Sequence, residues 1–381
     1  MVRLRNIEIL GAGPAGLYAS ILLKTLVPSA QIRVTEQNPD DATFGFGVVF
    51  SDQALDFLRV DDPHCHALIA PHMERWRSMD LSLAGERVTL DGIGFAAIGR
   101  LRLLQILQQR AAELGVTTRF GYELTAIEEI ETGADLVVGA DGVNSLLRRS
   151  YADQFSPRLE YFDNHFAWFG TARAFDTLTQ TFIRSPQGAL NAHHYRYSPN
   201  MSTFIVECDH DSFVAHGFAE MDEQASADAC ARLFADTLEA APLLLNHSHW
   251  RRFPRLSCTN WVFGRRVILG DAAHSAHFSI GSGTRLAFED AIALVGALRE
   301  SDDLATALQR FQQQRQPIVH KIVEAASRSA RWYENFSSHM DLPAMQFGYE
   351  YLARSGRMDL DRLRLISPQF VGRYEEFKKD Q

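Results

Sequence analysis

The chain has 381 residues, a hydrophobic fraction of 46% and a formal net charge of −9 at pH 7, which is ordinary for a folded globular protein with one large domain or two smaller ones. The acidic balance and the scattered Lys and Arg residues argue against nucleic acid as a partner, and no apolar run approaches the ~18 residues of a membrane span. The four cysteines form no CxxC pair and the start resembles no secretion signal, so the sequence predicts a cytoplasmic protein without a metal site.

A strand, a glycine-rich turn and a helix form the first recognisable unit. An apolar run over residues 7–10 leads into Gly11-Ala12-Gly13-Pro14-Ala15-Gly16, and an apolar-periodic stretch leads out to Leu26. In this pattern the first glycine allows the turn, the second lets a pyrophosphate approach the backbone, and the third lets the helix pack close to the strand. The N-terminus of such a helix offers free N–H groups to phosphates.

The next strand supports the same interpretation. Residues 31–35 form a predicted strand that ends at Glu36, and an acid at this place holds a ribose hydroxyl in dinucleotide-binding folds. The turn and Glu36 together predict a dinucleotide site. The alternative is a tight strand–helix turn that binds no ligand.

Four further elements are expected before residue 115. Phe44–Phe50 places two glycines between aromatic residues, which predicts either a backbone that passes close to a flat group or a hairpin or bulge. A short helix is expected from Ser51 to Leu58, a hairpin over Trp76–Leu90, and a helix from Leu101 to Leu114 that ends at a glycine cap.

Strand candidates over 117–120 and 122–130 follow, and a buried strand then delivers Asp141-Gly142 as a second nucleotide-site signature. After Tyr151 the pattern changes to short runs of aromatic and β-branched residues. They predict an antiparallel sheet inserted between the nucleotide-binding segments. The runs are 165–171, 181–184, 189–197 and 202–208.

A third strand that ends at Gly-Asp completes the set. Arg266–His274 delivers Asp271, and Gly281-Ser282-Gly283 opens a long helix that reaches Leu298. Separate helices are expected to begin at Leu304 and at Pro317.

These elements predict an α/β fold with a Rossmann-like nucleotide-binding domain, an inserted antiparallel β-sheet substrate domain and C-terminal helices. Residues 1–150, with a small hairpin region at about 72–95, and residues 256–300 are expected to form the nucleotide-binding domain. Residues 151–255 would form the sheet domain and residues 301–381 the C-terminal helices.

The three signatures are GxGPAG, ADGxxSxxR, and GDAAH followed by a Gly-x-Gly helix start. In this order they resemble the single-component FAD-dependent aromatic hydroxylases, and the resemblance covers essentially the whole chain. It implies the fold of p-hydroxybenzoate hydroxylase, with a Rossmann-like FAD-binding domain.

The resemblance also implies which residues hold FAD. The glycine turn would bind the ADP pyrophosphate. Asp141 would lie near both FAD and the place where the reductant works, and Asp271 would hold the ribityl or ribose chain of FAD. Gly281-Ser282-Gly283 would place a helix N-terminus at the flavin pyrimidine edge, where reduced flavin carries negative charge. The cofactor residues implied are Gly11, Gly13, Pro14, Ala15, Gly16, Glu36, Arg100, Asp141, Asp271, Gly281, Ser282 and Gly283. For Arg100 the alternative is a surface or capping arginine.

The third signature departs from the wider family, which has a proline and then GQGxN after GDAAH. Here Phe278, Ser282 and Arg285 replace the proline, glutamine and asparagine. This variant is similar to monooxygenases of aryl-CoA thioesters, such as salicylyl-CoA 5-hydroxylase and anthraniloyl-CoA monooxygenase, and to the tryptophan-type hydroxylase of violacein biosynthesis. The chain leaves no room for the old-yellow-enzyme-like domain of bifunctional aryl-CoA enzymes, so oxygenation without ring reduction is expected.

The family chemistry needs FAD, NADPH or NADH as reductant, and O2, and it hydroxylates an electron-rich aromatic ring through a flavin hydroperoxide. The leading hypothesis is an aryl-CoA thioester as substrate. The runner-up is an indolic or other natural-product intermediate, and a weaker alternative is a flavin-binding protein without catalytic activity. Arg328 with Arg331, or Arg251 with Arg252 and Arg255, are candidate cations for CoA phosphates, with solvated surface charge as the alternative.

Ring hydroxylation is helped by a base near the ring and a source of a proton. His277, His194 and Tyr195 are candidates because imidazole and phenol groups suit these roles. One of the adjacent residues His193 and His194 is expected to face inward. The alternative is that they are packed or exposed side chains.

The ring itself needs an apolar pocket. Val48, Trp168 and Phe278 are the candidates for its walls. Aromatic core packing is the alternative for these side chains.

Overall fold

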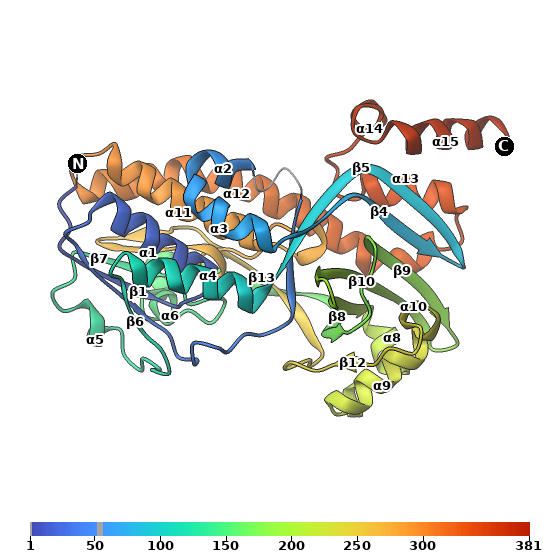
Figure 1. The fold of residues 1–381 in the computed structure, drawn as a ribbon, viewed down its shortest axis with the longest axis horizontal. Helices are drawn as coiled ribbons and strands as arrows, with labels where there is room; N and C mark the ends of the chain where they lie inside the picture. Colours follow the sequence, from blue (N-terminus) through green and yellow to red (C-terminus); the bar gives the residue numbers. More distant parts are fainter. Residues whose placement is uncertain (1, 52–55) are drawn as a thin grey trace.

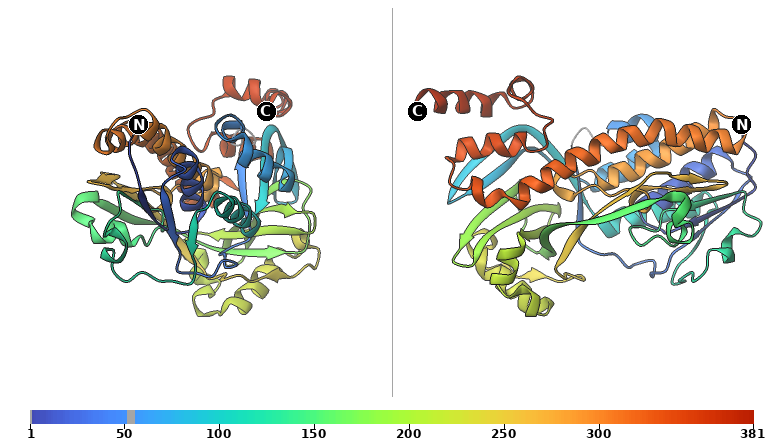
Figure 2. Two further views of the ribbon diagram at one scale, coloured as in Figure 1. Left: turned by 60° about the vertical axis from the view of Figure 1, so that its left-hand side comes forward. Right: turned by 180° about the vertical axis from the view of Figure 1, so that it is seen from behind.

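Two β-sheets, placed toward opposite ends of an elongated molecule, organise the chain (Figure 1). The computed structural model describes residues 2–51 and 56–381. The two ends of the chain lie at opposite ends of the long axis, which the right-hand view in Figure 2 also shows. The α/β fold predicted from the sequence is confirmed.

The first sheet has six strands, and all neighbours are parallel except β14 and β15. Its central strands are buried between layers, which explains their nearly continuous apolar sequence. In sheet order the strands are β14 (Val262–Phe263), β15 (Arg266–Ile268), β7 (Leu136–Gly139), β1 (Asn6–Leu10), β2 (Gln31–Thr35) and β6 (Thr117–Arg119).

Four long helices pack against one another and cover this sheet (Figure 1). They are α1 (Pro14–Leu26), α4 (Arg100–Glu113), α11 (Gly283–Arg299) and α12 (Leu304–Glu334). The first of them starts with a proline, whose fixed φ suits the first helical position. Shorter helices complete this part: α2 (Asp56–Asp61), α3 (Pro63–Ile69), η2 (Ala70–His72), α5 (Glu128–Glu131), α6 (Leu146–Ser150) and α7 (Ala152–Phe155).

The second sheet has nine strands and is largely antiparallel. Eight of them follow one another in the order β12 (Leu243–Leu244), β8 (Pro157–Thr171), β11 (Met201–Cys208), β10 (Gly188–Ser198), β9 (Leu178–Ser185), β4 (Glu74–Leu83), β5 (Glu86–Gly99) and β3 (Gly47–Ser51). The ninth, β13 (Arg251–Cys258), pairs with β8.

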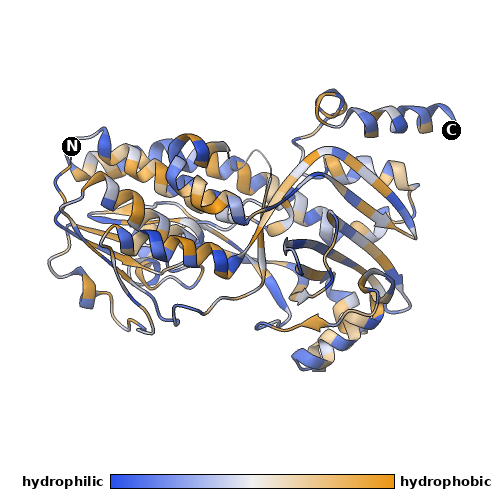
Figure 3. Ribbon diagram, viewed as in Figure 1, coloured by the Kyte–Doolittle hydropathy of each residue, from blue (hydrophilic) through white to orange (hydrophobic). Residues whose placement is uncertain are grey.

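Both faces of the second sheet are covered, and each carries its own apolar core. One core lies under α8 (His210–Ala215), η3 (Phe218–Glu220), α9 (Glu223–Leu233) and α10 (Ala235–Leu238). The other lies under the end of α12, η6 (Phe336–His339), α13 (Ala344–Ala353), α14 (Leu360–Ile366) and α15 (Pro368–Lys379). Figure 3 shows that helices at the surface combine hydrophilic and apolar residues, as helices with one buried face do.

The hairpin expected over Trp76–Leu90 is confirmed as β4 and β5. β4 pairs in parallel with β9, so this hairpin extends the second sheet, whereas β5 ends at Gly99 where α4 begins. The domain boundaries stay a prediction. The helix expected from Ser51 to Leu58 falls partly on residues 52–55, which lie outside the described residues, and α2 begins at Asp56.

The two helices expected from Leu304 and Pro317 form one helix of 31 residues, so that prediction is wrong. A proline removes one backbone donor, here the one that would bond to the carbonyl of Gln313. Both Pro317 and Gln313 are exposed. The helix continues because water can satisfy a carbonyl on that face, and it then reaches from the first core into the second.

The strand expected over 122–130 is also wrong, because this stretch is a loop that leads into α5. The Glu129 carboxylate accepts hydrogen bonds from the N–H groups of Thr125 and Ala126 at 3.3 and 3.1 Å. Such local bonds satisfy the backbone without a neighbouring strand.

Within the described residues, no helix combines the length and the apolar character needed to cross a bilayer.

A side chain from β5 caps the last helix. The Asp91 carboxylate accepts hydrogen bonds from the N–H groups of Phe370 and Gln369 at 2.8 and 3.1 Å and from the Ser367 hydroxyl at 2.9 Å. Partial burial works to raise the pKa of Asp91, but these hydrogen bonds outweigh it and lower the pKa. The cap is therefore present at neutral pH and is lost as the pH falls below the usual range of an aspartate.

We expect Asp91→Ala to loosen α15, because it leaves N–H groups of the first turn without an acceptor. Loss of an N-cap costs roughly 1–2 kcal/mol. Hydrogen exchange of the amides in 360–379 should become faster in this variant. The matched control is Asp228→Ala on the exposed face of α9, and equal exchange in the two variants would contradict the capping role.

Candidate functional site

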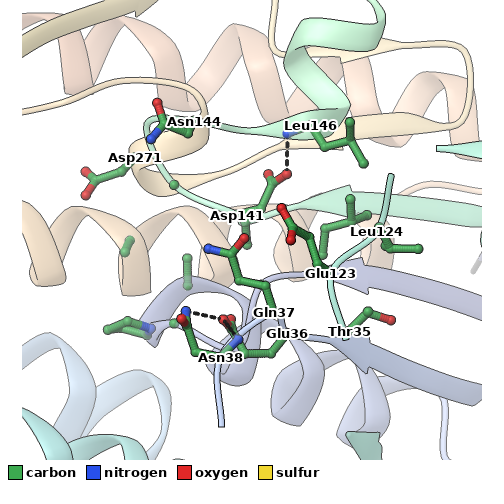
Figure 4. Close-up of a pocket in the computed structure, with 18 of the residues that line it drawn as sticks. Thr35, Glu36, Gln37, Asn38, Glu123, Leu124, Asp141, Asn144, Leu146 and Asp271 are labelled. Atoms are coloured by element: carbon green, nitrogen blue, oxygen red, sulfur yellow. Dashed lines mark hydrogen bonds between the residues drawn. The ribbon is translucent and has the colours of Figure 1, made fainter. Parts of the chain in front are cut away.

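A pocket lies at the carboxyl ends of β1, β2 and β7 (Figure 4), which is where parallel α/β sheets bind ligands. One end is formed by Glu36, Gln37 and Asn38, and the other by Asp271 with the start of α11. Nine of the twelve residues expected to hold a cofactor line it. They are Gly11, Gly13, Pro14, Ala15, Glu36, Arg100, Asp141, Asp271 and Gly283.

The glycines of the first turn have separate structural reasons. Gly11 has φ +91°, and a Cβ there would lie 2.4 Å from the carbonyl oxygen of Ala140. A Cβ on Gly16 would lie 2.0 Å from the carbonyl oxygen of Gly11, so only glycine lets α1 approach the turn. A Cβ on Gly13 would meet nothing within 4 Å. Gly13 therefore faces open space, as a backbone that cradles a phosphate must.

Glu36 connects the glycine turn to the end of β2. Its carboxylate accepts hydrogen bonds from the N–H of Ala12 at 2.8 Å and from the N–H and side-chain amide of Asn38 at 2.9 and 2.7 Å. Figure 4 shows the contact with Asn38 at the edge of the pocket. The position matches that expected for a residue that binds a ribose.

Two charged groups in the pocket lack full pairing within the described residues. The Nε of Arg100 and the Oδ1 of Asp141 are buried and have no hydrogen-bond partner there, whereas Asp141 Oδ2 accepts from the N–H of Leu146 at 2.6 Å. Burial lowers the pKa of Arg100, and nearby Asp271 opposes this. Burial by the surrounding protein raises the pKa of Asp141 and of Asp271. Buried groups left unpaired are expected where a polar ligand completes the site.

A buried network holds Asp271 in place. Asp271 lies in the turn η4 (Gly270–Ala272) after β15. Asp290 of α11 accepts hydrogen bonds from the N–H of Gly270 at 3.0 Å and from His274 Nε2 at 2.7 Å. Arg315 of α12 donates to the same carboxylate at 2.7 Å. The turn that carries Asp271 is thereby fixed to two helices.

The other three predicted cofactor residues lie next to the pocket or beneath it. Gly16 packs under the turn, as described above. Gly281 has φ +60° and ends the turn η5 (Phe278–Ile280). Ser282 precedes α11 and its hydroxyl bonds to the carbonyl of Ile280 at 3.2 Å. Gly283, in the first turn of α11, has open space where a Cβ would be.

These features fit a dinucleotide such as FAD. The open backbone at Gly13 and Gly283, the helix N-termini of α1 and α11, and the unpaired polar atoms of Arg100 and Asp141 face one pocket. Helix N-termini and glycine backbones favour phosphates and developing negative charge.

A cluster of aromatic rings lies on the other side of η5. His277 stacks on Phe278 with ring centroids 4.2 Å apart, and it meets the edges of Phe253 and Phe162 at 4.9 and 5.4 Å. Phe166 of β8 lies 5.0 Å from Phe278. The turn η5 therefore connects this aromatic cluster directly to the cofactor pocket.

Glu207 is the acid of this cluster, and it was not among the predicted site residues. It lies on β11, is 2% exposed, and its Oε1 is 3.9 Å from His277 Nε2. The Asn164 amide donates to the same oxygen at 2.8 Å. Burial raises the pKa of Glu207 to about 8, with a small contribution from Glu334. The sequence signal that could have identified Glu207 is its position as the single acid in the apolar run Phe204–Cys208.

Of the two residues, His277 is not the one that titrates near neutrality. Burial, with the charges of Arg354 and His193, lowers the pKa of His277 to about 3. Its Nδ1 accepts a hydrogen bond from the N–H of Ser279 at 3.3 Å, so the neutral ring carries its proton on Nε2, toward Glu207. His277 therefore packs in the cluster as a neutral ring, and Glu207, with its pKa of about 8, is the group that can exchange a proton near neutral pH.

The expectation that one of the histidine pair faces inward is resolved in favour of His193. Adjacent residues on a strand point to opposite faces. His194 packs between Phe175 and Phe204 at 4.0 and 5.3 Å and bonds to Thr181 at 2.9 Å, in the core under α9. It therefore does not share a site with His277, contrary to its choice as a catalytic candidate. His193 lies on the other face of the sheet, the face that carries Glu207 of the neighbouring strand.

Tyr195 lies on the same face as His193, but its hydroxyl is used in a structural contact. It donates to the carbonyl of Gly47 at 2.9 Å and is buried. Burial raises its pKa. The structure thus gives Tyr195 a role in fixing the start of β3.

Two of the three expected wall residues lie together, and the third lies apart from them. Phe278 and Trp168 flank Phe166 on one face of the second sheet. Val48 is buried in the core next to the first sheet, and its neighbour Val49 is the residue that meets Gly281.

The glycines between Phe44 and Phe50 pack against flat side chains. A Cβ on Gly45 would lie 2.7 Å from the indole of Trp168, and one on Gly47 would lie 2.6 Å from Tyr197. Of the two alternatives, the close approach to a flat group is confirmed, with the group supplied by the protein itself.

Among the residues described, no group of three or more His, Cys, Asp or Glu side chains is arranged to hold a metal ion.

Comparisons with known proteins support a flavin site. Residues 5–326 match the family described as "FAD binding domain". The chain is 40% identical to salicyloyl-CoA 5-hydroxylase of a Streptomyces species over 92% of this chain and 70% of that protein.

Two further relatives match nearly full length. The chain is 33% identical to a 3-hydroxy-4-methyl-anthranilyl-[aryl-carrier protein] 5-monooxygenase of Streptosporangium sibiricum, over 93% of this chain and 95% of that one. It is 32% identical to protodeoxyviolaceinate monooxygenase of Chromobacterium violaceum, over 92% and 94%. The fold is similar to that of 2-methyl-3-hydroxypyridine-5-carboxylic acid oxygenase, with a TM-score of 0.74 at 19% identity over 93% of this chain and 96% of that chain.

We expect Asp271→Ala to weaken FAD binding by about ten-fold or more, because a polar contact to the cofactor is lost. The dissociation constant for FAD, measured by flavin fluorescence, tests this. Asp153→Ala on the surface is the control. A variant that keeps full flavin content after dialysis would contradict the assignment.

The pKa of Glu207 predicts a pH-dependent effect on stability. The folded state keeps its proton up to about pH 8, whereas the unfolded state loses it near pH 4.3. Stability therefore falls as the pH rises between these values. We expect Glu207→Gln to be nearly neutral at pH 4.5 and stabilising at pH 9, on the order of 4 kcal/mol.

Urea unfolding of this variant and the unmodified chain at several pH values measures the difference. Glu220→Gln, at an exposed position, is the control. A difference in unfolding free energy that stays constant from pH 4.5 to pH 9 would show that Glu207 is ionised in the folded protein.

Proposed function

The chain belongs to the FAD-binding monooxygenases, as an aromatic hydroxylase, and from this premise we propose that it hydroxylates an aromatic ring carried as a thioester. An aryl-CoA such as salicylyl-CoA or anthraniloyl-CoA is the first candidate. One observation supports a thioester as the substrate. Two relatives, at 40% and 33% identity over more than nine-tenths of this chain, have names that specify a CoA thioester and a carrier-bound aryl group.

FAD supplies the redox and oxygen chemistry when it is bound. The chain would hold it with the glycine turn at the pyrophosphate, Glu36 at the adenosine ribose, and Asp271 at the ribityl chain. Arg100 and the first turn of α11 supply positive charge in the same pocket, which favours a cofactor that becomes more negative on reduction.

The aromatic cluster would orient the ring and exclude water. Phe278 and Phe166 present flat apolar surfaces beside the cofactor pocket. Their packing with His277 and Phe253 leaves little room for solvent around the Glu207 carboxyl. Water exclusion strengthens the electrostatic interactions inside such a site.

Glu207 would act as the proton-holding group. Its carboxyl keeps a proton at neutral pH because burial raises its pKa to about 8. A group with a pKa near the working pH can both donate and accept a proton during turnover. Asn164 would fix the orientation of this carboxyl by its hydrogen bond, and His277 lies beside it with Nε2 3.9 Å from Oε1.

Reduction by NADH or NADPH is part of the proposal. The sequence contains one dinucleotide fingerprint, Gly11–Gly16, which lines the pocket assigned to FAD. The nicotinamide would therefore reach the flavin without a second Rossmann domain.

A second candidate is supported by the 32% identity to protodeoxyviolaceinate monooxygenase. On this alternative the substrate is an indolic or other natural-product intermediate without a thioester arm. The same cofactor pocket and aromatic cluster would serve both reactions, so only a comparison of substrates distinguishes the two candidates.

The deciding experiment measures NADH and NADPH oxidation by the FAD-loaded protein with salicylyl-CoA, anthraniloyl-CoA, the free acids and indolic compounds. We expect oxidation to rise only with the thioesters and the product to gain one oxygen atom. Asp271→Ala, which should retain little flavin, is the matched control.

Oxygenation of indolic compounds alone would favour the second candidate. No stimulation by any ring compound, with FAD fully bound, would favour a flavin-binding protein without this activity.

A further inference from the structure

A second cavity, of about 690 Å³, lies on the opposite side of the start of α4 from the cofactor pocket. Its volume is in the range of ligand sites. Its walls come from residues 43–46, η2, the first turns of α4 and the turn between β10 and β11. The residues that line this cavity do not line the cofactor pocket, although Arg100 of that pocket directly precedes Leu101 of this one. We call it the carrier cavity.

The carrier cavity is lined by both apolar side chains and side chains with amide groups. Phe46, Met73 and Leu101 are apolar, whereas Gln105 and Asn246 offer amide groups. A flexible chain of methylene and amide groups likewise has apolar stretches and hydrogen-bonding groups. Such a chain gains apolar contact along its length and hydrogen bonds at intervals.

Only a thin wall separates the carrier cavity from the aromatic face of the second sheet. Gly45 lines the cavity, and its α-carbon lies directly against Trp168, since a Cβ there would be 2.7 Å from the indole. Tyr197 also lines the cavity and packs against Gly47 and Gly99. One layer of backbone at Gly45 therefore lies between the cavity and Trp168, and a thioester that joins a ring beside Trp168 to an arm in the cavity requires this segment to move aside.

The charge of the carrier cavity comes from Arg102. Its guanidinium donates to His72 Nε2 at 3.0 Å, so His72 acts as the acceptor in this contact. The carboxylate of the same cavity, Glu74, is paired with Arg196 at 2.8 Å. Among the described residues Arg102 has no carboxylate partner within 4.0 Å. The cavity thus has one uncompensated positive charge near its rim.

Four of the five arginines suggested by the sequence for CoA phosphates have other contacts, and the fifth, Arg331 of α12, does not line this cavity. Arg252 pairs with Asp163 at 2.7 Å and Arg255 with Glu160 at 3.2 Å. Arg251 and Arg328 donate to backbone carbonyls. This leaves Arg102 as the better placed cation.

We propose that the carrier cavity binds the phosphopantetheine arm of a thioester substrate, with Arg102 at its phosphate and the thioester end toward Trp168. The inference rests on the proposed function, since it deepens the thioester specificity suggested there. The arm is the same chemical group in coenzyme A and on a carrier protein.

The first test is binding without turnover. Coenzyme A and pantetheine, which lacks the phosphates, are titrated by calorimetry into the FAD-loaded protein, Arg102→Ala, and the control Arg110→Ala at the far end of α4. We expect Arg102→Ala to weaken coenzyme A binding by about ten-fold, because a charge-assisted contact is lost, and to leave pantetheine binding unchanged. Equal affinity for coenzyme A in all three proteins would overturn the proposal.

The second test uses turnover to separate the two proposals. For one aryl acid, the CoA thioester, the N-acetylcysteamine thioester and the carrier-protein thioester are compared. Arg102→Ala should raise KM about ten-fold for the substrates that bear a phosphate, with kcat unchanged, and should not affect the N-acetylcysteamine thioester. Gln105→Trp, which fills the cavity from an exposed position of α4, should raise KM for all three.

The outcomes are distinguishable. If the unmodified chain oxygenates no thioester, the proposed function fails. If it oxygenates thioesters and neither variant changes KM, the function stands and the carrier cavity is not the arm site. A response with the carrier-protein thioester alone would identify a carrier protein as the source of the arm, and a response with the CoA thioester alone would identify coenzyme A.

Discussion

The buried carboxylate of Asp290 is the contact on which the cofactor side of the molecule depends. A carboxylate without water is costly unless it is both paired and hydrogen-bonded. Burial works to raise the pKa of Asp290, but His274 and Arg315 outweigh it and lower the pKa. These partners belong to the segment after β15 and to α12, so the turn and two helices are stable only together. Because Asp271 follows Gly270 directly, its place in the pocket is set by this network.

The cofactor pocket was predictable from the sequence because its constraints are local. Gly11 and Gly16 are required by contacts within one strand–turn–helix unit, and no long-range knowledge is needed to see that a side chain would not fit. The same holds for Asp141 and Asp271, each of which follows a buried strand of one parallel sheet. Strands of such a sheet bring their carboxyl ends to one edge, so the order of three signatures was enough to predict one pocket.

The aromatic side of the site was less predictable because it depends on tertiary contacts. Because side chains alternate along a strand, the sequence shows that His193 and His194 face opposite sides of the sheet, but it does not show which side meets η5. That depends on β10 pairing between β9 and β11, and on which helices cover each face. Glu207 was missed for a related reason, since its raised pKa comes from burial by segments distant in sequence. The loop after β6 was misjudged because a side chain, Glu129, satisfied its backbone.

The start of α4 connects these parts. Successive helix residues are rotated by about 100°, so Arg100 and Arg102 point about 200° apart, toward the cofactor pocket and the carrier cavity respectively. The N–H of Arg100 donates to the carbonyl of Phe46 at 2.8 Å. The segment 43–47 is in turn held by Asn246, which donates to the carbonyls of Thr43 and Gly45 at 3.0 and 2.8 Å. A side chain at Gly45 would move this segment off Trp168. It would thereby displace Phe46 and the helix start, so the glycine preserves both cavities at once.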